Sequence, residues 1–166
     1  MDEKLLTQLY RMYSRELLLY LISLCHDAPL AEDLLQETFL KAILSLNAAH
    51  TNMRAWLYTV ARNLCFNAVK KRDREAQGRM LDHEYNLNSP LDQLLDEERD
   101  HALYMALNQL EHRKREVLVL QYFGGLNQKE IAHVLGITAE NVRMIAHRGR
   151  RELKKILEKE GCYDLS

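Results

Sequence analysis

Apolar residues recur every three or four positions along most of the chain, a spacing that places side chains on one face of an α-helix. In residues 2–25 the repeat consists of Leu6, Leu9, Tyr13, Leu17, Leu21 and Leu24. Ala28-Pro29 breaks this repeat, and a second helix is predicted from about Leu30 to Leu46. After a stretch without a period, Asn47 to Asn52, a third helix is predicted from Met53 to about Arg74.

The helical pattern then fades and resumes near the middle of the chain. Residues 76–89 are polar, and we interpret them as a flexible linker. Ser89-Pro90 is a helix start signal, which predicts a helix over 90–110, and a strongly apolar segment predicts another over 112–123. The expected fold is all-α. It has two small helical domains joined by the linker, residues 1–75 and 90–166.

The segment "NQKEIAHVLGITAENVRMIAHRGRREL", residues 127–153, has the pattern of a helix-turn-helix motif. Asn127 with Glu130 resembles a capping box, Gly136 can adopt positive φ in the turn, and Thr138 can cap the second helix. Small or apolar residues occupy the places where the two helices meet: Ile131, Ala132, Leu135, Ile137, Val142 and Ile145.

The second helix of this motif has a basic face. Arg143, His147, Arg150 and Arg151 lie three or four positions apart and therefore on one side, with Thr138 at the helix start. This side could lie in the major groove of DNA, with phosphate contacts from Arg148, Lys154 and Lys155. The alternative is an ordinary helical hairpin whose arginines are only solvated.

A formal net charge of −1 conceals two basic segments. Residues 51–75 have six basic and two acidic side chains, and residues 127–155 have seven and three. Residues 76–100, which lie between them, have two basic and seven acidic side chains. Because basic segments attract phosphate and acidic segments repel it, this layout favours two separate contacts with nucleic acid over a uniform coating of it.

The sequence gives little support for a membrane protein, a disulfide-rich or zinc-binding protein, or an enzyme. No apolar run reaches the ~18 residues of a membrane span, so we expect no membrane insertion and a cytoplasmic location. Cys25, Cys65 and Cys162 are far apart, which is poor material for a disulfide framework or a zinc site. The chain has neither a nucleotide-binding glycine loop nor an HExxH motif. We therefore expect no catalytic residues, no cofactor and no metal.

Specific runs in both predicted domains resemble one family. "AEDLLQETFLKAILSL" (31–46) and "MRAWLYTVARNLCFNAVKKRDRE" (53–75) resemble the first conserved domain of bacterial sigma factors of the extracytoplasmic-function (ECF) class. "LEHRKREVLVLQYFGGLNQKEIA" (110–132) and the helix-turn-helix resemble the second. The resemblance implies an alternative, signal-responsive sigma factor that binds core RNA polymerase and directs initiation at promoters with minus-ten and minus-thirty-five elements. Core polymerase and promoter DNA are the expected partners, and an anti-sigma factor is a further candidate.

The resemblance also assigns residues to these tasks. It implies polymerase docking by Asp33, Gln36 and Glu37. It implies that the loop Asn47 to Asn52 captures an unstacked base of the minus-ten element. The next helix would contact the same element with Val60, Arg62, Asn63, Asn67, Lys70, Lys71 and Arg72. The minus-thirty-five element would be contacted by Thr138, Arg143, His147, Arg148, Arg150 and Arg151.

Two residues depart from the usual pattern of the family. Asn67 occupies a place where the family usually has Asp, and Ile145 one where it usually has Arg or another polar residue. Trp56 could be a stacking platform, but its place at the start of an apolar stripe favours the core.

The main rival interpretation is a repressor or activator with a helical dimerisation domain, and it leaves the runs over 31–46 and 53–75 unexplained.

Overall fold

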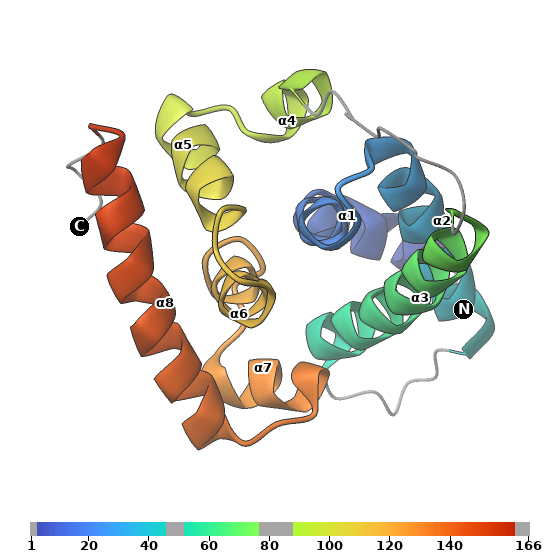
Figure 1. Cartoon of the computed structure of the whole chain (residues 1–166). Coiled ribbons are helices and arrows are strands. Elements are labelled where there is room, and N and C mark those ends of the chain that lie inside the picture. Colours follow the sequence, from blue (N-terminus) through green and yellow to red (C-terminus); the bar gives the residue numbers. More distant parts are fainter. Residues whose placement is uncertain (1–2, 46–51, 77–87, 162–166) are drawn as a thin grey trace. The chain divides into compact units, whose positions relative to one another are not determined.

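The computed structural model describes residues 3–45, 52–76 and 88–161. Within these ranges every regular element is an α-helix, which confirms the all-α prediction. The chain divides into two compact units, residues 1–88 and 89–166, each with its own internal packing (Figure 1). The predicted linker lies largely outside the described residues.

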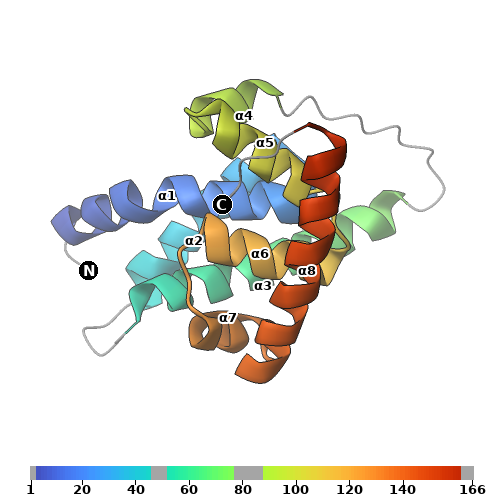
Figure 2. The same cartoon turned by 90° about the vertical axis from the view of Figure 1, so that its left-hand side faces the viewer.

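The first unit is a bundle of three long helices. α1 (Glu3–Cys25), α2 (Ala28–Ser45) and α3 (Met53–Ala76) each contact the other two (Figures 1 and 2). Their apolar stripes meet in a common core that includes two tilted tyrosine rings, Tyr20 and Tyr58, with centroids 5.2 Å apart. Other fully or nearly fully buried side chains include Leu17, Leu21, Ile22, Ala31, Leu34, Leu35, Leu57, Ala61 and Cys65.

The joint between α1 and α2 is held by α3. The Asp27 carboxylate accepts a hydrogen bond from the Leu30 amide and so caps α2, at 3.2 Å. Arg72 Nη1 of α3 donates to the Cys25 carbonyl oxygen at 3.0 Å. Cys25 and Cys65 are both buried and free thiols, and a hydrogen bond with the Cys65 side chain lowers the pKa of Cys25 below its ordinary value. Two cysteines that are distant in sequence therefore meet in the core.

The second unit is organised around its longest helix. α5 (Glu98–Leu107), α6 (His112–Tyr122) and α7 (Gln128–Leu135) all pack against α8 (Ala139–Lys159), as Figure 1 shows. α6 is close to the apolar helix expected from the sequence. The core of the unit is built from Tyr104, Leu107, Val117, Leu118, Leu120, Ile131, Val142, Ala146, Leu153 and Leu157.

The prediction of a single helix over 90–110 is wrong. The structure has two helices there, α4 (Asn88–Leu94) and α5, and the first begins at Asn88 instead of Pro90. Glu97 is the N-cap of α5, and Glu98 and Asp100 lie in its first turn. Acidic side chains are stabilising at a helix N-terminus and unfavourable near a C-terminus, so this acidic run favours a new start over continuation of α4.

α8 approaches α6 very closely at Gly149. A Cβ atom built at Gly149 would lie 2.9 Å from Leu118 Cδ1 and 3.4 Å from Lys114 Cβ. The first distance is shorter than a normal carbon–carbon contact. The absence of a side chain at this one position thus lets the two helices pack face to face in the middle of the unit.

Candidate nucleic-acid interfaces

The helix-turn-helix has the caps that its sequence predicts. The Asn127 side chain accepts from the Glu130 amide and the Glu130 carboxylate accepts from the Asn127 amide, both at 2.9 Å. Gly136 ends α7 with φ of 68°, in the left-handed region that favours glycine. Thr138 Oγ1 then accepts from the Asn141 amide at 3.1 Å and starts α8. These local caps fix where α7 begins and ends and where α8 begins.

The core of the motif is also as predicted. Ile131, Ala132, Leu135 and Val142 are buried, and Ile137 and Ile145 are half-buried. Ile145 therefore packs at the edge of the motif and offers no polar group to DNA. The buried side of α8 consists of Val142, Ala146, Gly149, Leu153 and Leu157, three or four positions apart.

The opposite side of α8 is cationic and exposed to solvent. Arg143, His147, Arg150 and Arg151 are all exposed and share this side, as the sequence spacing predicts. Arg148, Lys154 and Lys155 are exposed on the flanks of the same helix. Thr138 is exposed at the helix start, but its hydroxyl oxygen already serves as the cap. Guanidinium groups along one helix face can donate paired hydrogen bonds to base edges and phosphates.

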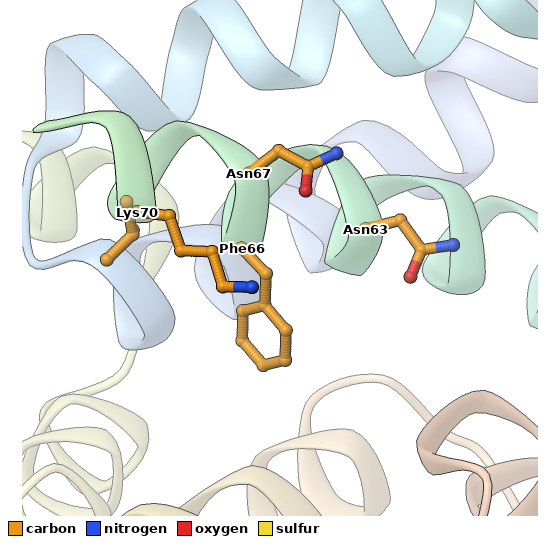
Figure 3. Close-up of a pocket in the computed structure, with 5 residues that line it drawn as sticks. Asn63, Phe66, Asn67 and Lys70 are labelled. Atoms are coloured by element: carbon orange, nitrogen blue, oxygen red, sulfur yellow. The ribbon is translucent and has the colours of Figure 1, made fainter.

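A second polar surface lies along α3. Asn63 and Asn67 are exposed one turn apart, and Lys70 follows them (Figure 3). Lys71 is the next residue and is also exposed. Val60 is half-buried one turn before Asn63. An open hollow on this surface is lined by Asn63, Phe66, Asn67, Val69 and Lys70. We call this group of five residues the α3 hollow. Amide groups are able to form paired hydrogen bonds with base edges, and lysines neutralise phosphates.

The two arginines assigned to this region by resemblance have partners within the protein. The Arg62 guanidinium lies over the ring of Phe66, 4.2 Å from the ring centroid. Arg72 is turned toward the α1–α2 joint, where it contacts the Cys25 carbonyl and lies 4.0 Å from Asp27 Oδ2. Arg72 is therefore placed away from Lys70 and Lys71, and the structure gives it a role in packing.

The start of α3 is anchored to α1. Asn52 Oδ1 accepts from the Ala55 amide at 3.0 Å, which caps the helix. Arg54 Nε lies 3.2 Å from Glu16 Oε1, and the Arg54 guanidinium lies over the Tyr13 ring, 5.3 Å from its centroid. Burial raises the pKa of the Glu16 carboxyl above its ordinary value, while the charge of Arg54 opposes this shift. These contacts fix the direction of α3 where the candidate minus-ten surface begins.

The loop before α3 and Trp56 near its start were both given roles from the sequence. The predicted base-capturing loop spans Asn47 to Asn52; its residues 47–51 lie outside the described residues, and only Asn52 is described. Trp56 was expected in the core, but it is half-buried, whereas its neighbours Ala55 and Leu57 are buried. Helical spacing places Trp56 on the same side of α3 as Val60 and Asn63.

The exposed side of α2 combines the predicted polar residues with an apolar extension. Asp33, Gln36 and Glu37 are all exposed and lie within one turn of each other. Leu40 and Leu44 continue the same side, and 54% and 78% of their surfaces are exposed. The apolar repeat of this helix does not single out these two leucines, because they lie off the buried stripe. The available signal was their register, three and seven positions after Glu37.

Among the described residues, no helix is both long enough and apolar enough to cross a lipid bilayer.

Comparisons with known proteins agree on one family. The sigma-70 region 2 family matches residues 9–75 and the sigma-70 region 4 family matches residues 106–155. The chain is 32% identical to the ECF RNA polymerase sigma factor SigM of Bacillus subtilis, over 90% of this chain and 93% of SigM. It is 34% identical to the RNA polymerase sigma factor YlaC of the same organism, over 91% of each chain.

A solved structure shows the same architecture. The sigma factor RpoE, in complex with the anti-sigma factor NepR from Bartonella quintana, matches with a TM-score of 0.70 and 26% sequence identity. The match covers 92% of this chain and 96% of that chain. With three helices in a region 2 unit and a helix-turn-helix in a region 4 unit, the chain belongs to the ECF class of the sigma-70 family of RNA polymerase sigma factors, which are transcription initiation factors.

Proposed function

We propose that this sigma factor docks on core RNA polymerase through α2, contacts the minus-ten element with α3 and reads the minus-thirty-five element with α8. In this proposal the functional domains are residues 1–75 and 90–166. The observation that carries it is the presence of two exposed cationic helix surfaces, one in each compact unit. Two separate surfaces are what a protein needs to contact two separated promoter elements.

The α8 surface is suited to duplex DNA. Its arginines project from the second helix of a rigid helix-turn-helix, the arrangement that places a helix in a major groove. Arg143 and His147 lie near the N-terminal part of the helix, where side chains of such helices meet base edges. Arg148, Arg150 and Arg151 lie further along and are suited to phosphates.

The α3 surface is suited to opened DNA. Asn63 and Asn67 present amides on the exposed side of the helix, and Lys70 and Lys71 add positive charge beside them. In this proposal the amides read base edges that are accessible once the strands separate, while the lysines hold the backbone. Arg62 contributes to this site through its contact with Phe66.

The α2 surface is suited to a protein partner. Its three polar side chains supply specificity, and the neighbouring exposed leucines supply apolar area of the kind found at the centre of protein interfaces. We assign this surface to core polymerase, which places the site of action in the cytoplasm. The likeness to a sigma factor solved with an anti-sigma factor supports a further part of the proposal, that an inhibitory partner makes this factor responsive to a signal.

The test is run-off transcription with purified core polymerase and a library of genomic DNA fragments. We expect the protein to direct initiation at a small set of start sites that core polymerase alone does not use. Scrambling either upstream element of such a promoter should abolish the product. A DNA-binding repressor would instead bind duplex DNA without polymerase and yield no new transcript, and that result would refute the proposal.

A further inference from the structure

Phe66 occupies an unusual place on α3. It is an aromatic residue whose ring is only partly buried, although the unit has a well-formed core immediately beneath this helix. Its neighbour Cys65 is fully buried, so the helix register turns Phe66 out of the core. The ring lines the α3 hollow together with Asn63, Asn67 and Lys70, as Figure 3 shows.

The surroundings of the ring hold it in a fixed position. The Arg62 guanidinium lies over the ring at 4.2 Å from its centroid, a cation–π contact that restricts the rotation of both side chains. Asn63 precedes Phe66 by one helical turn, and Lys70 follows it by one turn. An aromatic face is thus combined with an amide on one side and an ammonium group on the other.

This combination matches the way proteins bind single-stranded nucleic acid. A base stacks on an aromatic ring, a neighbouring amide reads its edge, and cations hold the backbone phosphates. Duplex DNA cannot use the ring in this way, because its base faces are covered by their neighbours in the stack. A flat ring beside two amides therefore points to a base that has left the duplex.

We infer that Phe66 is a stacking platform for one unpaired base of the minus-ten strand, next to the amides of Asn63 and Asn67. The inference rests on the proposed function, because it requires α3 to contact the opened element. Arg62 acts as a positioning residue that holds the ring and adds charge near the phosphates. Phe66 then determines how tightly one base is held after the strands separate, while the amides determine which base is accepted.

The experiment measures holoenzyme binding to single-stranded oligonucleotides that contain the minus-ten element of a promoter used in run-off transcription. A series of oligonucleotides removes one base at a time and leaves an abasic sugar. Stacking on an aromatic side chain contributes about 1–3 kcal/mol per base, so the critical abasic site should weaken wild-type binding by roughly 5- to 150-fold. Phe66→Leu retains apolar bulk without the ring face, and it should lose most of this sensitivity at that one position.

Phe66→Tyr is the matched control, because it retains the ring face and should respond to the abasic series as the wild type does. Comparing intact and abasic DNA on the same variant cancels any loss of folded protein. Equal sensitivity of Phe66→Leu and the wild type at every position would overturn the inference. So would a Phe66→Tyr variant that behaves like Phe66→Leu, since that indicates a packing role.

A second comparison separates failure of the inference from failure of the proposed function. Wild-type holoenzyme that binds matched and scrambled single strands equally refutes the assignment of α3 to the minus-ten element. Wild-type holoenzyme that discriminates between them, with no position at which Phe66→Leu differs, refutes only the stacking role of Phe66. If the variant instead weakens binding to intact duplex DNA alone, the ring contacts a thymine methyl group, and the stacking role is again refuted.

Discussion

Arg143 lies on the exposed side of α8 one turn before His147, in the part of the helix closest to the turn of the motif. At this position a guanidinium can donate two hydrogen bonds to one guanine. We predict that Arg143→Ala weakens binding of the holoenzyme to its promoter by about 1–3 kcal/mol and relaxes the preference at one base pair. The measurement is affinity for a set of promoters in which each minus-thirty-five base pair is changed in turn.

Lys159→Ala is the control for this experiment. It removes the same charge from the far end of α8, where the side chain is also exposed. It should weaken binding slightly, by about the same factor for every promoter in the set, and leave every base preference in place. If Arg143→Ala also leaves every preference unchanged, Arg143 contacts only phosphate or nothing, and its assignment as a base reader is wrong.

For individual side chains, exposure was predictable from the sequence where the residues follow a strict helical register. Arg143, His147 and Arg151 are exposed as expected, and so are Asn63 and Asn67. Arg72 could not be placed from its charge alone, because its role depends on a carbonyl oxygen of the joint between α1 and α2. The candidate role of Phe66 could not be predicted for a similar reason. It depends on the Arg62 guanidinium lying over the ring, a contact that the sequence does not reveal.

Among the elements, α8 packs very closely against α6 at one glycine. Its Gly149 lies against Leu118 of α6 so closely that a Cβ atom would lie 2.9 Å from Leu118 Cδ1. We predict that Gly149→Leu lowers the free energy of unfolding by about 1–3 kcal/mol, because it overpacks the contact between the helices. Gly149→Ala should change stability much less, since a gain in helix propensity of about 1 kcal/mol offsets the shift of one flexible leucine end. Chemical denaturation of the full chain, followed by circular dichroism, measures both.

A double variant tests whether this contact is the cause. Leu118→Ala removes the side chain that a larger residue at position 149 would meet. The combination of Leu118→Ala with Gly149→Leu should therefore be less destabilising than the sum of the two single changes, by at least 0.5 kcal/mol. Additive effects would show that Gly149→Leu acts elsewhere, for example through the local conformation of α8 alone.

The helices themselves differed in how well their boundaries could be predicted. The start of α7 and of α8 was predictable, because Asn127 and Thr138 form local caps whose partners are three residues away. The break between α4 and α5 was not, because Ser89-Pro90 predicts a helix start and no Gly or Pro marks an end before Leu110. The acidic run at Glu97 and Glu98 was the better signal, since it marks a second helix start.

For the whole molecule, the separation of basic and acidic segments limits how strongly the protein can bind DNA without core polymerase. A chain with a net charge of −1 has little general attraction for DNA, even though α3 and α8 are basic. Opening duplex DNA costs about 1.4 kcal/mol for each stacked step. One captured base returns about 1–3 kcal/mol. Promoter opening over several base pairs therefore requires binding energy from polymerase, which in the proposed function is gained through the α2 surface.

Glu37 provides the test of this dependence. It lies on the exposed side of α2 between Asp33 and Leu40, where a charge reversal leaves the core of the unit untouched. We predict that Glu37→Lys weakens binding to core polymerase by roughly tenfold or more, since misplacing charge in an interface costs at least about 1.4 kcal/mol. Glu75→Lys makes the same change at an exposed position of α3, outside the α2 surface, and should bind core polymerase normally. Titration of labelled protein with core polymerase measures both affinities, and circular dichroism checks that helix content is retained. Run-off transcription should fall in parallel for Glu37→Lys alone. Two variants with equal affinity for core polymerase would show that this side of α2 is not the docking surface.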